Sequence, residues 1–205
     1  LHVKRKDTTA AIADYQRALS YQSDHAEAMA NLYQLSKNGD YQKILAETYE
    51  LAVSEQGSYE AYFNRAVYYQ GRSKHRSAIQ DFDRALAMAG ADDEALLLRA
   101  FSKEHTADLK GALIDYSRAL RLNPMLAKAY SNRANVYYKL KKYKEAINDY
   151  NRAIEFFPEN ARLFYNRGLA LYQDGQLTDA CIDLHISLEM GYTNANAPLR
   201  AYCQD

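Results

Sequence analysis

The sequence lacks the features that would place it in a membrane or on nucleic acid. No apolar run approaches the ~18 residues that a transmembrane helix requires, and residues 1–6 are not followed by the apolar core of a signal peptide. Lysine plus arginine equals aspartate plus glutamate at 26 each, so the basic surplus that binds a phosphate backbone is missing. We therefore expect neither membrane insertion nor a nucleic-acid partner, and these features fit a cytoplasmic or a periplasmic protein alike.

Cysteine and recognisable catalytic motifs are also scarce. Cys181 and Cys203 have neither CxxC spacing nor a nearby histidine that would complete a metal site. Cys181 falls where other parts of the chain carry Ile79, Leu113 and Ile147, which predicts a small buried hydrophobic side chain. No Ser-His-Asp set, HExxH motif or glycine-rich phosphate loop can be assembled from local spacing. We expect no metal, no cofactor and no catalysis.

What the sequence does contain is a repeat that returns every 34 positions. One block occurs three times, as AIQDFDRAL at 78–86, ALIDYSRAL at 112–120 and AINDYNRAI at 146–154. A second block precedes it at the same spacing, for example YFNRA at 62–66 and YSNRA at 130–134. Both carry apolar residues three and four apart, the pattern of amphipathic helices. Each repeat is therefore predicted to contain two helices.

These blocks resemble the tetratricopeptide repeat (TPR). That family has small residues at repeat positions eight and twenty, and residues 127–160 match it best, with Ala134 and Ala146 there. Tyr130 and Tyr150 occupy its aromatic positions four and twenty-four. The resemblance implies an all-α fold, a right-handed superhelical solenoid of antiparallel helix pairs, because a single pair cannot bury its apolar face and stacked neighbours can.

In this register the chain divides into seven parts. They are a truncated repeat at 1–25, mainly a second helix, a degenerate repeat at 26–58, repeats at 59–92, 93–126, 127–160 and 161–194, and a capping helix at 195–205. Because the chain begins inside a repeat, we expect the natural protein to extend further towards its N-terminus.

An arginine recurs at a position that is usually apolar in the family, with an aspartate sixteen residues later. The pairs are Arg65 with Asp81, Arg99 with Asp115, Arg133 with Asp149, and Arg167 with Asp183. An arginine inside a helix pair needs a carboxylate partner, because an unpaired buried charge is costly. We favour structural ion pairs over a role in ligand binding.

The resemblance also implies that the first helices line a concave groove. Groove position six reads Asn31, Asn64, Leu98, Asn132 and Asn166, an asparagine ladder broken once. A carboxamide both donates and accepts hydrogen bonds, so it can bracket one peptide unit of an extended chain. A similar ladder binds substrate backbone in the TPR part of O-linked N-acetylglucosamine transferase, although asparagine is common at this position throughout the family.

Other groove positions predict what the ligand looks like. Phe63, Val67, Leu97, Leu98 and Phe101 would form an apolar patch that faces the ligand, unless packing within the superhelix covers it. The predicted peptide-binding residues are Asn31, Phe63, Asn64, Leu97, Leu98, Phe101, Lys128, Asn132, Asn135, Tyr138, Lys139, Arg162, Tyr165, Asn166 and Tyr172.

The groove edge changes from acidic, at Glu60 and Glu94, to basic, at Lys128 and Arg162. A ligand with an acidic segment or a free carboxylate would therefore prefer the C-terminal repeats. We expect no carboxylate clamp like that of chaperone-binding TPRs, because Leu97, Phe101 and Asn166 replace its lysine, asparagine and arginine.

Together these features predict a protein-interaction scaffold that holds an extended peptide or partner segment. There are two alternatives: the targeting arm of a larger enzyme, such as a glycosyltransferase, or a module that self-associates into a homo-oligomer. First-helix arginines and abundant tyrosine are typical of bacterial TPR proteins.

Overall fold

The computed structural model describes residues 39–55 and 57–203, and these are helical with no β-strand among them. The helices are α3 (Gly39–Glu55), α4 (Tyr59–Gly71), α5 (His75–Ala89), α6 (Asp93–His105), α7 (Leu109–Leu122), α8 (Ala127–Lys139), α9 (Tyr143–Phe156), α10 (Ala161–Gln173), α11 (Leu177–Glu189), the short 3₁₀ helix η2 (Thr193–Ala195) and α12 (Asn196–Tyr202). The all-α prediction is confirmed for these residues. The predicted truncated repeat at 1–25, the start of the degenerate repeat and Asn31 lie outside the described residues.

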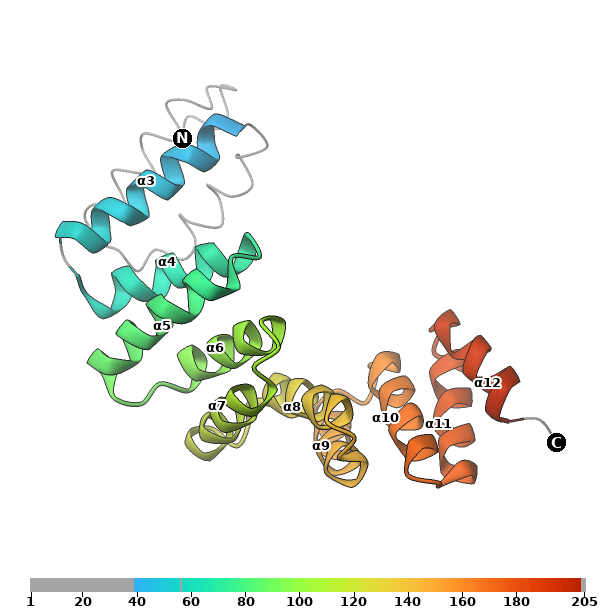
Figure 1. The fold of residues 1–205 in the computed structure, drawn as a ribbon. Helices are drawn as coiled ribbons and strands as arrows, with labels where there is room; N and C mark the ends of the chain where they lie inside the picture. The colour runs from blue at the N-terminus through green and yellow to red at the C-terminus, as the bar shows by residue number, and fades with distance from the viewer. Residues whose placement is uncertain (1–38, 56, 204–205) are drawn as a thin grey trace. The chain divides into compact units, whose positions relative to one another are not determined.

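The chain forms two compact units, Leu1–Gly90 and Ala91–Asp205. In the second unit α6 packs with α7, α8 with α9, and α10 with α11, and each pair follows the previous one (Figure 1). The first helices begin at residues 93, 127 and 161, and the second helices at 109, 143 and 177, so both series advance by the period of the sequence repeat. In the first unit α4 packs with α5 and α3 packs on α4.

Side chains that precede the helices fix where several of them begin. Asp92 accepts a hydrogen bond from the backbone N–H of Ala95 in α6 at 2.6 Å, and Asp108 does the same for Gly111 in α7 at 2.9 Å. Each carboxylate satisfies an N–H group that the first turn leaves without a partner.

One residue with a left-handed backbone makes the turn inside each helix pair. These residues are Ser73 (φ 57°), Ala107 (φ 65°), Lys141 (φ 59°) and Gly175 (φ 85°), and they are again one repeat period apart. Glycine adopts this conformation without steric cost, whereas other residues are strained. Only the last described pair carries glycine at this turn.

Small residues at the helix crossings let the paired backbones approach closely. Ala100 and Ala112, and likewise Ala134 and Ala146, are fully buried, and large side chains such as Tyr150 fill the remaining space beside them. In the α10–α11 pair Gly168 takes the alanine position. A Cβ there would lie 3.2 Å from the carbonyl oxygen of Ala180 and 3.1 Å from Leu184 Cγ, so a side chain at this position would require its neighbours to shift.

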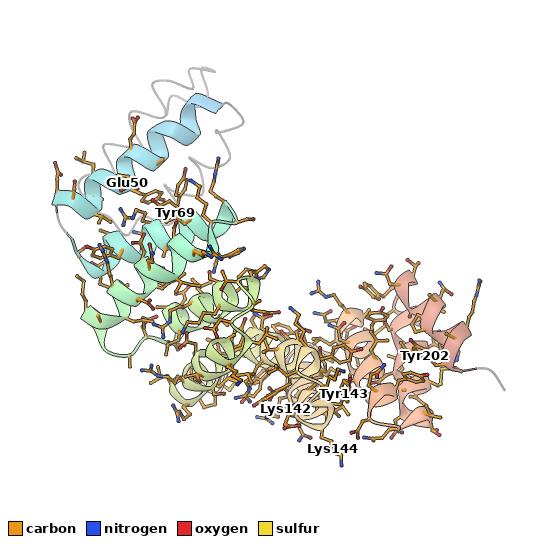
Figure 2. All side chains as sticks on the ribbon, viewed as in Figure 1. Glu50, Tyr69, Lys142, Tyr143, Lys144 and Tyr202 are labelled. Carbon is orange, nitrogen blue, oxygen red and sulfur yellow. A yellow bond between two sulfur atoms is a disulfide. The ribbon has the colours of Figure 1, made fainter. Side chains whose placement is uncertain are left out.

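The C-terminal end is closed by η2 and α12. Leu184 of α11 forms a buried cluster with Ala195 and Leu199. Tyr202 (Figure 2) stacks on Tyr172 of α10 with ring centroids 3.7 Å apart and an interplanar angle of 15°. The last apolar face of the array is therefore covered by the segment that follows the repeats.

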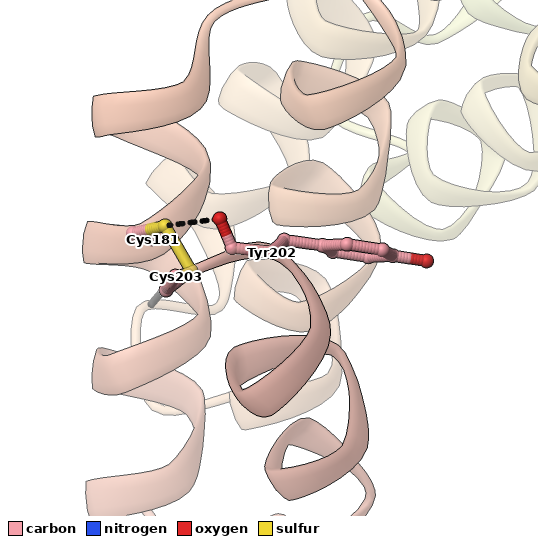
Figure 3. Close-up of a disulfide and its surroundings, with 3 residues drawn as sticks. All are labelled: Cys181, Tyr202 and Cys203. Carbon is pink, nitrogen blue, oxygen red and sulfur yellow. Dashed lines mark hydrogen bonds between the residues drawn. A yellow bond between two sulfur atoms is a disulfide. The ribbon is translucent and has the colours of Figure 1, made fainter. Parts of the chain in front are cut away.

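A disulfide between Cys181 and Cys203 fastens this segment to α11 (Figure 3). Our prediction of a simple buried hydrophobic side chain at Cys181 is wrong: the residue is half-buried and covalently bonded. The return of α12 along α11 brings the two Cα atoms to 5.7 Å, a separation that a disulfide can bridge. Cys203 lies beyond the repeats, so the repeat register contained no information about its neighbour.

Candidate functional site

All four arginine–aspartate contacts are present in the structure, and each is bidentate. The guanidinium Nε and Nη2 atoms of Arg133 donate to the two carboxylate oxygens of Asp149 at 2.7 and 2.8 Å. The corresponding contacts of Arg65 with Asp81, Arg99 with Asp115, and Arg167 with Asp183 are all 2.7 Å. The four aspartates are buried, which makes each ion pair an internal link between the two helices of a pair.

The remaining guanidinium nitrogen reaches back to the preceding helix pair. Arg133 Nη1 donates to Ser117 Oγ at 3.0 Å, and Arg167 Nη1 donates to Asn151 Oδ1 at 2.7 Å. The sequence spacing did not indicate this second contact. Each of these arginines therefore joins three helices.

The first unit shows the same arrangement with a charged partner. Arg65 Nη1 donates to Glu50 of α3 at 2.7 Å, and Tyr69 donates to the other oxygen of that carboxylate at 2.6 Å (Figure 2). Burial, with the nearby Glu50 charge, raises the pKa of Tyr69 to about 12. The hydrogen bond to Asp81 raises the pKa of Arg65 further above its already high value.

A pocket of about 400 Å³ opens on the first helices of the second unit. Its lining consists of Phe101, Glu104 and His105 from α6, Asn132, Asn135, Tyr138 and Lys139 from α8, Arg162, Asn166 and Leu169 from α10, and Tyr150 from α9. We call this lining the first-helix pocket. It brings together seven of the predicted peptide-binding residues, and none of the eight arginine and aspartate residues described above is among its lining.

Three amide-bearing or hydroxyl-bearing side chains are linked in the wall of this pocket. The Tyr150 hydroxyl donates to Asn135 Oδ1 at 2.6 Å, and Asn166 Nδ2 donates to the same oxygen at 3.4 Å. Burial raises the pKa of Tyr150, so its O–H remains a donor. Among the described residues none accepts from the Asn135 amide nitrogen, which leaves that nitrogen as a donor beside the acceptor oxygen of Asn166.

Glu104 is a pocket residue that the sequence analysis missed. Its carboxylate accepts from Lys139 Nζ at 2.6 Å and from the Tyr116 hydroxyl at 3.3 Å, and its side chain is 9% exposed. Burial and the Glu104 charge raise the pKa of Tyr116, against a hydrogen bond from Asn132 that lowers it. Position twelve of the next two repeats is tyrosine, so only the groove register itself pointed to Glu104.

This carboxylate changes the charge that the pocket offers a ligand. Lys139 contributed to the predicted basic end, but its ammonium group is paired with Glu104. Arg162 is exposed and takes part in none of the ion pairs found among the described residues. The positive charge of the first-helix pocket therefore rests mainly on Arg162.

The other predicted C-terminal residues lie outside the pocket lining. Lys128 is exposed at the start of α8. Tyr165 packs on Tyr192, with ring centroids 5.1 Å apart, and Tyr172 lies under the ring of Tyr202. The segment after α11 thus occupies both of these groove positions.

The predicted apolar patch is divided. Phe63, in the first unit with Asn64, packs between Tyr59 and Phe82 at centroid distances of 5.6 and 5.8 Å. In the second unit Leu97 packs against the buried cluster around Ala100 and Tyr116, and Leu98 is half-buried. Phe101 contacts the His105 ring at 4.1 Å and is the member that lines the first-helix pocket.

The part of the chain that the structure describes shows neither a membrane-spanning helix nor a metal-binding cluster. None of its helices is both long enough and apolar enough to cross a membrane. No group of three or more histidine, cysteine, aspartate or glutamate side chains in it is arranged to hold a metal ion.

Known proteins resemble this chain in its repeats and in its fold. Residues 108–141 and 134–175 match a family model described as "TPR repeat". A search of curated proteins finds no match.

Solved structures share the fold at low sequence identity. YrrB is 17% identical with a TM-score of 0.72, over 91% of this chain and 97% of that one. MamA from Desulfovibrio magneticus RS-1 is 22% identical with a TM-score of 0.63, over 65% and 75%. A TPR protein from Parabacteroides merdae is 19% identical with a TM-score of 0.68, over 92% and 75%. Together with the regular succession of helix pairs, these likenesses show that the chain has the fold of tetratricopeptide-repeat proteins.

Proposed function

We propose that this protein is an interaction scaffold whose first-helix pocket holds an extended segment of a partner protein. The observation that carries the proposal is the polarity of the pocket wall. The side chains of Asn135 and Asn166, from successive first helices, are joined by one hydrogen bond, which leaves the Asn135 amide nitrogen as a donor and the Asn166 amide oxygen as an acceptor. A peptide unit needs one donor and one acceptor, so this pair matches its carbonyl and its N–H.

The wall is organised before a ligand arrives. The buried Tyr150 hydroxyl occupies Asn135 Oδ1, which fixes which end of that amide faces the pocket. Amide groups that are already oriented lose little conformational entropy on binding, and this favours affinity.

Charge adds a preference for acidic segments. Since Glu104 neutralises Lys139, Arg162 supplies the uncompensated charge, and a guanidinium binds a carboxylate through two hydrogen bonds. The partner segment would place an acidic side chain or a C-terminal carboxylate on Arg162. YrrB, a relative in fold, is described as having an unusual peptide-binding site, which supports a peptide-binding role for this architecture. The proposal assigns the pocket no chemical reaction.

Affinity capture followed by direct binding measurements tests the proposal. The protein and a variant with Phe101→Ala, Asn135→Ala and Asn166→Ala are each used to capture partners. A matched variant with Asn148→Ala, an exposed amide on α9 outside the pocket, controls for a general loss of surface amides.

Captured proteins are divided into overlapping peptides, and calorimetry measures the affinity of each. We expect one linear segment to bind the protein and the Asn148→Ala variant equally, and the triple variant at least tenfold more weakly. If the triple variant retains the same partners with the same affinities, the first-helix pocket is not the binding site.

A further inference from the structure

A second depression, of about 530 Å³, lies beside the first-helix pocket. It surrounds the loop between α9 and α10 and is lined by Phe156, Phe157, Pro158, Glu159, Asn160, Ala161, Arg162 and Tyr192. Arg162 belongs to the lining of both hollows. The two are therefore neighbouring parts of one surface, the first polar and the second largely apolar.

Comparison with the preceding loop shows that the aromatic lining is not required by the fold. Asn123 and Phe157 occupy the same repeat position, immediately after α7 and α9 respectively. Asn123 ties its loop to the frame, since its Nδ2 donates to Asp93 at 2.7 Å and its Oδ1 accepts from the Met125 N–H at 3.1 Å. Phe157 cannot make either hydrogen bond, and the residue is 44% exposed.

Tyr192, another residue of the depression lining, is held by contacts with its neighbours. Its ring packs on Tyr165 at 5.1 Å, and its hydroxyl accepts from Asn194 Nδ2 at 3.1 Å. An exposed phenylalanine, a tyrosine held by its neighbours and an arginine in one lining have the composition of an interaction hot spot.

We propose that this depression anchors a large apolar side chain of the partner segment, preferably an aromatic one, while a carboxylate close to it in the segment binds Arg162. The proposal rests on the proposed function, because it specifies which segments the pocket selects. Successive side chains of an extended chain point in opposite directions, and residues two apart lie on one side about 6.5 to 7 Å apart. The selected motif therefore has an acidic residue and an aromatic residue separated by one position.

Glu159 sets a limit on this motif. It lines the depression and is absent from the first-helix pocket lining, so a second acidic residue next to the anchor would meet its negative charge. The site is thus suited to one carboxylate followed or preceded by an apolar anchor, not to a run of acidic residues.

Fluorescence anisotropy with designed peptides tests the inference. Four blocked, labelled peptides share an alanine–serine background and carry at their centre Asp-Ala-Phe, Asp-Ala-Ala, Asn-Ala-Phe or Asn-Ala-Ala, each also made in reversed order. The protein variants are Phe157→Asn, which copies the residue of the preceding loop, and Arg162→Gln. Met125→Asn and Arg118→Gln, which change exposed residues outside both hollows, are their matched controls.

We expect one orientation of the Asp-Ala-Phe peptide to bind most tightly. Phe157→Asn should weaken that peptide about tenfold and the Asp-Ala-Ala peptide by less than about twofold. Arg162→Gln should weaken the aspartate peptides about tenfold and leave the asparagine peptides nearly unchanged. The control variants should bind as the unmodified protein does.

The outcomes separate this inference from the proposed function. If Asn135→Ala with Asn166→Ala weakens all peptides equally while Phe157→Asn and Arg162→Gln change none selectively, the pocket binds backbone and the anchor proposal is wrong. If Phe157→Asn and Arg162→Gln weaken binding selectively but the asparagine variants have no effect, the anchor proposal is supported and the pocket does not bind the peptide backbone. Absence of binding by every peptide up to about 1 mM overturns the anchor motif, and the capture experiment still decides the proposed function.

Discussion

In the middle of the second unit and at its C-terminal end, the faces of the helices are held and covered by different means. In the α8–α9 pair, Arg133 binds Asp149 and reaches back to Ser117, and Ala134 and Ala146 set the crossing. At the C-terminal end α11 has no following repeat among the described residues, and a covalent bond, an aromatic stack and the short helix α12 cover its face.

This difference separates two groups of residues. Those that hold neighbouring helix pairs together are here called the frame, and those that cover the C-terminal end are called the closure. Residues that recur in every repeat belong to the frame, because the same neighbours are present at each step. Residues that occur once, such as Phe157, Tyr192 and the two cysteines, act at the boundary or on the surface. The candidate ligand surface combines both classes: its amides are repeated, and its proposed anchor is not.

The strongest way to break the frame is to remove a buried carboxylate. Asp149→Ala leaves the guanidinium of Arg133 without its bidentate partner inside the helix pair, and we expect a loss of about 3 to 5 kcal/mol in unfolding free energy, measured by urea denaturation. Asp179→Ala, an exposed change on α11, should cost less than about 0.5 kcal/mol. A loss below about 1 kcal/mol for Asp149→Ala would show that the pair does not hold the frame.

Removing the disulfide should damage the closure and spare the frame. The bond spans a sequence separation of 22 residues, and a loop of this size corresponds to about 3 kcal/mol of lost chain entropy in the unfolded state. With Cys181→Ser and Cys203→Ser, we expect fast amide exchange in α12, a helix of seven residues that is too short to persist alone.

Amide exchange in α8 and α9 should remain slow in the double serine variant, and the ring of Tyr202 should no longer stack on that of Tyr172. Treatment of the unmodified protein with dithiothreitol should reproduce the pattern, because reduction by the dithiol converts the bond into two thiols. The serine variant should not respond to the reagent. Uniform loss of protection across the second unit would mean that closure and frame unfold together.

The repeated features were the predictable ones. The constant period of the sequence locates the helix pairs, and a spacing of sixteen places each arginine one helix away from its aspartate. Four occurrences make such a pattern visible without any structure. The periodicity predicts two helices in each repeat, and the resemblance to the TPR family implies that these pairs stack, which buries the faces that a single pair leaves exposed.

The unrepeated features were not predictable in the same way. Nothing in the register pairs Cys181 with Cys203, because the second cysteine lies past the last repeat. Glu104 stands where the following repeats have tyrosine, so its neutralisation of Lys139 appears only when α6 and α8 are placed together. The contacts of the arginines with the preceding helix pair depend equally on how neighbouring repeats stack.

A smaller effect on stability is expected where α10 crosses α11 than where a buried carboxylate is removed. Gly168→Ala adds a Cβ that meets the Ala180 carbonyl oxygen, Leu184 and Asp183 at 3.1 to 3.2 Å, and a backbone atom cannot move aside as a flexible side chain can. We expect a loss of about 1 to 3 kcal/mol from overpacking, measured by thermal unfolding. The frame residue Ala134 already carries a Cβ at the equivalent position, so Ala134→Gly should cost about 1 kcal/mol through helix propensity. Equal stability of Gly168→Ala and the unmodified protein would mean that the α10–α11 crossing has room for the added Cβ.

The turns inside the helix pairs offer the smallest and most symmetrical test. Lys141 adopts φ 59° and Gly175 adopts φ 85° at equivalent positions, and a side chain in this region is strained by roughly 1 kcal/mol. Lys141→Gly should therefore stabilise the protein by up to about 1 kcal/mol, reduced by the entropy that glycine adds to the unfolded chain. Gly175→Ala, which has open space around the new Cβ, should destabilise it by a similar amount. Opposite shifts in melting temperature would show that these turns share one backbone geometry, whereas shifts of the same sign would show that the last helix pair turns differently from the frame.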